Sequence, residues 1–279
     1  MKLRFTIIFI LISFNTFGQN TSKKTAPIIK EAKRLYDVEM ASWYGTDIFI
    51  EKYPNKENIG GYFSYVDKNV PTCIFFNRDE SPKIIGTITF DSTYNVQTAS
   101  VNLEERNLNT IEGELYMLRK KAIELAQKDT IFKSYKNTAL NFIPLINGKD
   151  KKVYILTGPQ KSGVVIFGND YLITFDKKNN IKSRKQLHRN IIPIYYGAEE
   201  EKDEQTMHTH SPETGDFITA TDICTLMLYA KYTKWKQHTV ISKKYMNIWN
   251  CSSNELFVMT VEAMKKINEH QAKQKEQNR

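Results

Sequence analysis

Three side chains in the second half of the sequence have the types and the spacing of a metal site. His208 and His210 are separated by a single residue, and Asp222 follows them along the chain. Side chains two positions apart in a β-strand point to the same face, so both imidazoles would face one way. Two imidazoles and one carboxylate make a zinc site that keeps one coordination position open. A water molecule in that position becomes acidic enough to attack a carbonyl group near neutral pH.

The elements around these residues must bring the carboxylate to the imidazoles. We expect a strand at the two histidines and a helix that begins just after Thr219, which lies three residues before Asp222. This is the spacing of a residue pair that caps a helix N-terminus. Apolar residues then recur at helical spacing over 223–232, so Asp222 would project from the first turn. The alternative is that Thr219 and Asp222 only cap the helix, and that the histidines are polar residues at a strand end.

This order of residues resembles the JAMM (MPN-type) metalloproteases, in which His-x-His and then Ser-x-x-Asp at a helix start hold zinc. The resemblance covers at most residues 109–262, and only the C-terminal part of that range carries the motif. It implies that His208, His210 and Asp222 are zinc ligands. It also implies that Thr219, in the place of the family's serine, helps to stabilise the oxyanion. The activity implied by the resemblance is hydrolysis of peptide or isopeptide bonds.

The sequence departs from the family's pattern at the general base. The family uses an upstream glutamate for this role, but no glutamate occurs between Leu125 and Ala198. Asp170 is the carboxylate that we nominate in its place, because proton transfer needs a titratable side chain near the reacting water. Gly168 and Asn169 are typical of a hairpin turn, so Asp170 could instead serve at the tip of that turn.

Three classes of function remain open. The first is a zinc-dependent hydrolase of peptide or isopeptide bonds, the second is a non-catalytic exported binding module of the cell envelope, and the third is an envelope-associated structural protein. The partner in either of the first two classes would be a protein, a peptide or an envelope polymer. His188 and His238 could converge on the metal site, but each is also a common type of structural histidine.

Composition narrows the choice of partners. The chain has 279 residues and a formal charge of +9, but the positive charge includes no basic run interleaved with aromatic residues. We therefore do not expect nucleic-acid binding. The three cysteines, Cys73, Cys224 and Cys251, include no CxxC pair. A single disulfide between Cys224 and Cys251 and three free buried thiols are both open.

Residues 1–18 have the features of a secretory signal peptide. A short basic start precedes the apolar run 5–14, and Thr16 and Gly18 place small residues before a cut at Gln19. The run is too short for a stable bilayer anchor, and no later stretch approaches about 20 apolar residues. We expect a periplasmic or secreted protein without a membrane span after signal removal. The alternative is an uncleaved N-terminal anchor.

The remaining pattern predicts an α+β fold. Residues 25–106 predict a helix, with Thr25 as its cap and Pro27 in its first turn, followed by an antiparallel meander. Residues 109–262 predict a mixed sheet flanked by helices, and 263–279 a polar, helical C-terminal tail. The strands of the meander are expected at 46–52, 60–66, 72–77, 83–90 and 97–103.

The second region begins with a predicted helix. Asn109 and Glu112 have the spacing of a capping box, and apolar residues recur on one helical face from Ile111 to Leu125. Further strands are expected at 140–146, 153–157, 163–167, 171–175, 191–196, 238–242 and 245–249.

Overall fold

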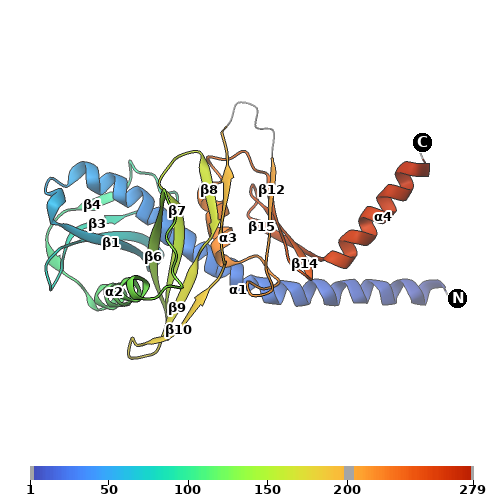
Figure 1. Cartoon of the computed structure of the whole chain (residues 1–279), viewed down its shortest axis with the longest axis horizontal. Coiled ribbons are helices and arrows are strands. Elements are labelled where there is room, and N and C mark those ends of the chain that lie inside the picture. Colours follow the sequence, from blue (N-terminus) through green and yellow to red (C-terminus); the bar gives the residue numbers. More distant parts are fainter. Residues whose placement is uncertain (1–2, 198–203, 278–279) are drawn as a thin grey trace. The chain divides into compact units, whose positions relative to one another are not determined.

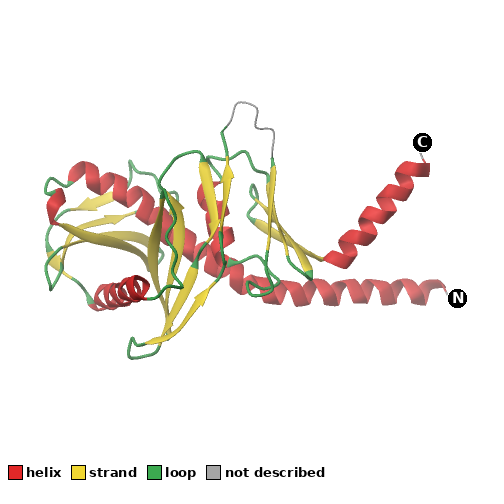
Figure 2. Cartoon of the chain, viewed as in Figure 1, coloured by secondary structure: helices red, strands yellow, loops and turns green. Residues whose placement is uncertain are grey.

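The computed structural model describes residues 3–197 and 204–277, with side chains described from residue 21 onward except at 275. The predicted α+β class is confirmed, because helices accompany antiparallel and mixed sheets (Figure 1 and Figure 2). The chain forms two compact units. Unit 1 comprises residues 1–33, 202–230 and 234–279, and unit 2 comprises residues 34–201 and 231–233.

The first helix, α1, runs from Leu3 to Lys52 and contributes residues to both units. The prediction that a helix starts near Thr25 and Pro27 is wrong, because both residues lie inside α1. Proline fixes its own φ at a helical value and is tolerated at a helix start, which made Pro27 look like a first-turn residue. The signal-peptide prediction stays a prediction, since the side chains of its segment lie outside the described ones.

The C-terminal end of α1 packs on the first sheet of unit 2, and the strand predicted at 46–52 is wrong. Phe49 stacks on Phe75 with ring centroids 3.8 Å apart. Gly86 leaves room for this ring, because a Cβ atom there would lie 2.3 Å from Cε2 of Phe49. Gly45, four residues before Phe49, is buried as well, which is helical spacing. Packing of this face on the sheet therefore overrides the local strand preference.

The first sheet of unit 2 is the antiparallel meander that the sequence predicts. Its strand order is β1–β2–β3–β4, and β5 also pairs with β3. The strand predicted at 97–103 is shorter than expected and corresponds to β4. A single 3-10 turn, Lys56–Asn58, precedes the sheet. The strands are β1 (Ile59–Asp67), β2 (Val70–Asn77), β3 (Lys83–Thr89), β4 (Ser100–Asn102) and β5 (Arg106–Asn107).

Helix α2 (Thr110–Lys128) contributes to two hydrophobic clusters in unit 2. It begins at the predicted capping box, in which the backbone N–H of Glu112 donates to Asn109 Oδ1 at 2.9 Å and the N–H of Asn109 donates to Glu112 Oε2 at 2.8 Å. Leu115 packs into the cluster formed with the first sheet, whereas Leu118 packs into a cluster formed with the second sheet. The apolar stripe predicted for this helix therefore has two partners.

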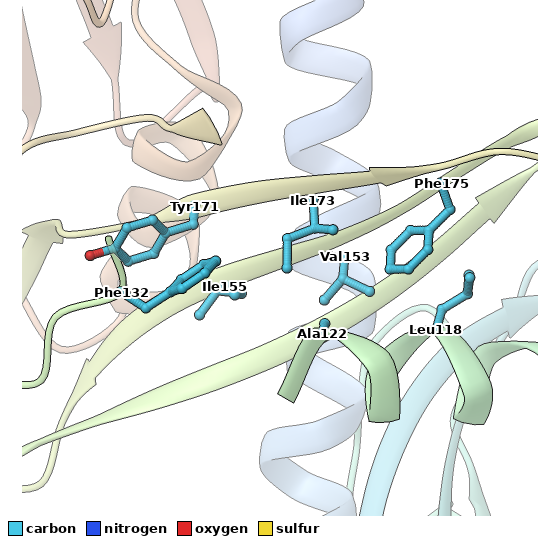
Figure 3. Close-up of a cluster of buried hydrophobic side chains, with 8 residues drawn as sticks. All are labelled: Leu118, Ala122, Phe132, Val153, Ile155, Tyr171, Ile173 and Phe175. Carbon is cyan, nitrogen blue, oxygen red and sulfur yellow. The ribbon is translucent and has the colours of Figure 1, made fainter. Parts of the chain in front are cut away.

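The second sheet of unit 2 has the strand order β10–β9–β7–β6 and is antiparallel. Figure 3 shows side chains of α2 lying against residues of β7 and β9 in its cluster. Strand β10 lies in a basic segment and was not predicted, because its side chains are almost all exposed. The strands are β6 (Thr138–Asn147), β7 (Asp150–Pro159), β9 (Tyr171–Phe175) and β10 (Ile181–Gln186). The cluster comprises Leu118, Ala122, Phe132, Val153, Ile155, Tyr171, Ile173 and Phe175.

The hairpin predicted around Asp170 is wrong. Strand β8 (Val164–Gly168) pairs with β11 (Ile191–Tyr195) and not with β9, which follows it in the chain. Gly168 and Asn169 do have positive φ values, of 78° and 50°, so they turn the chain as their residue types suggest. The turn delivers the chain to another sheet, so Asp170 is buried rather than exposed at a loop tip.

Unit 1 contains a four-stranded mixed sheet in the order β12–β13–β14–β15. Strands β12 and β13 are parallel, and helix α3 (Ala220–Tyr229) lies between them in the chain, as parallel pairing requires a crossover. The other pairs are antiparallel and extend the predicted closing hairpin by one strand. Helix α4 (Val261–Gln277) follows the sheet. The strands are β12 (Gln205–Thr209), β13 (Gln237–Ile241), β14 (Tyr245–Asn250) and β15 (Glu255–Thr260).

Cys73, Cys224 and Cys251 are all buried and none of them forms a disulfide, so the alternative of three thiols holds in this structure. Within the part of the chain that the structure describes, none of the helices combines the length and the apolar character that crossing a bilayer requires.

Candidate metal centre

Strand β12 places His208 and His210 on one face of the sheet of unit 1. His208 lies in β12, and His210 lies one residue beyond its end. The pairing with β13 continues there, because the backbone N–H of His210 donates to the carbonyl of Ile241 at 2.8 Å. The extended backbone therefore keeps its alternation, and both imidazoles point the same way.

Helix α3 presents Asp222 from its first turn. Thr219 is the N-cap, and its Oγ1 accepts a hydrogen bond from the backbone N–H of Asp222 at 3.1 Å. In return, Asp222 Oδ2 accepts hydrogen bonds from the backbone N–H of Thr219 at 2.9 Å and from its hydroxyl at 2.7 Å. These reciprocal bonds satisfy free donors at the helix start and hold the carboxylate in one orientation. The cap that the sequence indicates is therefore also the element that positions Asp222.

The three side chains meet in a buried cluster. Nε2 of His208 lies 3.1 Å from Nε2 of His210. Asp222 places Oδ2 3.2 Å from His210 Nε2 and Oδ1 3.6 Å from His208 Nε2. The relative exposures of His208, His210 and Asp222 are 5%, 7% and 2%. Imidazole nitrogens and a carboxylate at this spacing form a group that could hold a metal ion.

His238 on β13 extends this cluster away from the carboxylate. Its Nε2 lies 2.8 Å from Nδ1 of His208, and its own Nδ1 lies 2.7 Å from Oγ1 of Thr206. The pKa of His238 is lowered to about 3, mainly by burial and also by the neighbouring imidazoles of His208 and His210, although the carboxylate of Asp222 raises it. His238 is therefore neutral across the physiological range.

The sequence indicates only that His238, like His188, could converge on the metal site, and it assigns no role to either residue. The structure explains its position through the register of β12 and β13, in which Thr206 lies opposite His238 and His208 opposite Val240. His208 and His238 are thus diagonal neighbours on one face. The sequence could not reveal this contact, because neither strand alone indicates that β12 and β13 pair in parallel.

Asp170, the nominated base, lies in unit 2. Its Oδ1 is 2.7 Å from Nδ1 of His188, and both side chains are buried. The adjacent Asn169 is buried as well, and its amide donates to the carbonyl of Lys133 and to Thr157 Oγ1, both at 2.9 Å. Asp170, in the turn between β8 and β9, and His188, in the loop between β10 and β11, are therefore partners of each other within unit 2.

No protein-family model matches the chain, and neither does any curated protein or solved structure. The likeness to the JAMM metalloproteases therefore remains a resemblance carried by the motif residues.

Proposed function

We propose that unit 1 binds one zinc ion through His208, His210 and Asp222. The observation that carries this proposal is the spacing of the donor atoms, at 3.1, 3.2 and 3.6 Å. Zinc–ligand bonds of about 2.0–2.1 Å in a tetrahedron separate neighbouring ligand atoms by about 3.3 Å. The two Nε2 atoms are already near this separation, and each of them has one carboxylate oxygen of Asp222 within 3.6 Å, which lowers the cost of organising the site.

The donor set favours zinc over other abundant divalent ions. Imidazole nitrogen suits zinc, whereas magnesium and calcium prefer oxygen ligands alone. Three protein ligands leave one of the four tetrahedral positions open, as in catalytic zinc sites. A zinc ion held in this way lowers the pKa of water and polarises carbonyl groups.

Each of the three residues has a distinct part in holding the ion. His208 and His210 supply Nε2 atoms from one face of β12. Asp222 supplies its carboxylate, in which Oδ1 lies 3.6 Å from Nε2 of His208, and Oδ2, which accepts the hydrogen bonds from Thr219, lies 3.2 Å from Nε2 of His210. A carboxylate ligand that is hydrogen-bonded in this manner keeps its orientation.

On this basis we propose a hydrolase of peptide or isopeptide bonds in an exported protein. The resemblance of the motif to the JAMM metalloproteases supports the reaction class, and a zinc ion held by three protein ligands would keep one position for the water that hydrolysis needs. The substrate would be a protein, a peptide or a peptide-bearing envelope polymer. Asp170 is hydrogen-bonded to His188 in unit 2, and we assign it no step in proton transfer.

A second candidate is the non-catalytic binding module, and the same cluster supports it in one respect. Neutral histidines can link His210 through His208 and His238 to Thr206 by hydrogen bonds alone, while Asp222 accepts hydrogen bonds from Thr219. In that case the cluster is a structural network that fixes β12 against β13 and α3. It would then bind no metal.

The variant Asp222→Asn separates the two candidates. Asparagine keeps an oxygen that can cap α3 but removes the charge that binds a cation, so the helix should persist while zinc affinity falls by at least tenfold. Zinc affinity would be measured by competition with a chelating dye, and folding by circular dichroism. Peptide and isopeptide substrates would be assayed with and without zinc. Equal zinc affinity of the variant and the native chain would contradict the proposed site, whereas zinc binding without cleavage would contradict only the hydrolase.

A further inference from the structure

Nε2 of His208 is the nitrogen that would bind the metal. Whether it carries a proton depends on a chain of hydrogen bonds that begins at the other ring nitrogen, Nδ1. Oγ1 of Thr206 lies 2.7 Å from Nδ1 of His238, and Nε2 of His238 lies 2.8 Å from Nδ1 of His208. His238 has no exposed surface. Both of its ring nitrogens are engaged in this chain, so it is not itself placed as a ligand.

Two proton arrangements fit these atoms. In the first, Nδ1–H of His208 donates to Nε2 of His238, and Nδ1–H of His238 donates to the hydroxyl oxygen of Thr206. This arrangement leaves a lone pair on Nε2 of His208. In the second, the hydroxyl of Thr206 donates to His238, and Nε2–H of His238 donates to Nδ1 of His208. The proton of His208 then sits on Nε2, and that atom cannot bind a metal.

We propose that His238 is a positioning residue for the metal centre. Nε2 of His238 accepts a hydrogen bond from Nδ1–H of His208 and holds that ring in place. Nε2 of His208 then has a lone pair that can bind the ion. Metal-binding histidines usually donate their other ring N–H to a fixed acceptor, which sets the tautomer and the ring orientation. Here the acceptor is Nε2 of a second imidazole, whose Nδ1–H in turn donates to Oγ1 of Thr206. This inference rests on the metal site proposed above.

The hydroxyl of Thr206 allows the direction of these hydrogen bonds to reverse. A hydroxyl can donate or accept, so Thr206 supports both proton arrangements, whereas a carboxylate would accept only. Binding of an ion to Nε2 of His208 selects the first arrangement. The tautomers of His208 and His238 therefore report on the state of the metal site.

The first test measures zinc affinity by competition with a chelating dye. His238→Phe keeps a ring but removes the acceptor, and it should weaken zinc binding about 10–100-fold. His238→Gln keeps an acceptor and should recover part of that loss. Thr206→Val removes only the last link and should weaken binding less than His238→Phe does.

Val240→Ala is the matched control. Val240 is fully buried, lies opposite His208 in the strand register and makes no side-chain hydrogen bond. Its truncation loosens the packing but should leave zinc affinity unchanged. Native affinity in His238→Phe, or an equal loss in Val240→Ala, would overturn the positioning role while leaving the metal site intact. A native chain that binds no zinc would instead overturn the metal site.

A second test needs no variant, so it stands even if His238→Phe does not fold. Nitrogen NMR of the histidine-labelled, zinc-loaded chain identifies which ring nitrogen carries the proton. We expect the proton of His208 on Nδ1 and that of His238 on Nδ1 as well. A proton on Nε2 of His238 in the zinc-loaded chain would overturn the proposal.

Discussion

The Nε2 atoms of His208 and His210 face each other at 3.1 Å in the buried cluster of unit 1. Two lone pairs at this distance repel each other, so a proton or a cation must lie between or beside them. In the metal-free chain, an N–H on one of the two nitrogens that donates to the other satisfies the contact. A zinc ion bound to both nitrogens and to the carboxylate would satisfy it without the proton.

Thr219→Ala should reduce both stability and zinc affinity. The variant removes the hydroxyl that caps α3 and that donates to Asp222 Oδ2 at 2.7 Å. We expect a loss of about 1 kcal/mol in the free energy of unfolding, as is typical for a helix cap. We also expect weaker zinc binding, because the carboxylate loses a bond that orients it. Urea unfolding with and without a chelator, together with dye competition, measures both effects.

The equivalent cap on α2 provides the control for that experiment. Asn109 and Glu112 form the same reciprocal motif in unit 2, so Asn109→Ala should cost a similar amount of stability. It should leave zinc affinity at the native value. If both alanine variants lower zinc affinity equally, the effect of Thr219→Ala is one of general destabilisation, and the role of the cap in orienting Asp222 is refuted.

Glu39→Gln should change the dependence of stability on pH. Burial raises the pKa of Glu39 from 4.5 to about 7, although the amide of Asn141 donates to its Oε2 at 2.6 Å and lowers it. Between about pH 4.5 and pH 7, the folded chain therefore keeps a proton on Glu39 that the unfolded chain has already lost. The contribution of Glu39 to stability is fully present below about pH 4.5 and is lost as the pH rises through about 7.

Glutamine removes this titration and still accepts from Asn141. Near pH 4.5 the two proteins should differ little in the pH-dependent part of the free energy of unfolding. Above pH 7.5 this free energy should be about 1–3 kcal/mol higher for the variant. We expect a value toward the lower end, because Glu39 is only partly buried. Denaturant unfolding at a series of pH values tests this. Parallel curves for the two proteins would show that Glu39 does not have the raised pKa.

The three cysteines should react only when the chain unfolds. Cys73 has no exposed surface, and burial raises the pKa of its thiol to about 12, while burial raises that of Cys251 to about 11. The thiolate is the reactive form, so both groups should be inert in the folded chain. A thiol reagent should titrate three groups per chain in denaturant and almost none without it. One group in denaturant would instead reveal a disulfide.

The motif residues were predictable because the rules behind them are local. Alternation along a strand places His208 and His210 on one face, and the spacing of Thr219 and Asp222 defines a cap. The capping box at Asn109 was predictable for the same reason. Each of these rests on contacts within about four residues, which a single sequence reports directly.

The features that were missed depend on contacts distant in sequence. Residues 46–52 resemble a strand locally, but packing of Phe49 on Phe75 keeps them helical. The turn at Asn169 has hairpin chemistry, but the pairing of β8 with β11 makes it a link between sheets. His238 becomes a neighbour of His208 only through the parallel register of β12 and β13. Strand pairing and packing of this range leave no local signal.

The most direct test of the account is the zinc content of the purified chain. Elemental analysis should give one zinc per native chain after removal of free metal, and almost none in His210→Ala, because two ligands do not hold the ion stoichiometrically. His270→Ala is the control, since His270 is an exposed histidine of α4 and its loss should leave one zinc per chain. A native chain without zinc, or His210→Ala with the full amount, would contradict the metal centre.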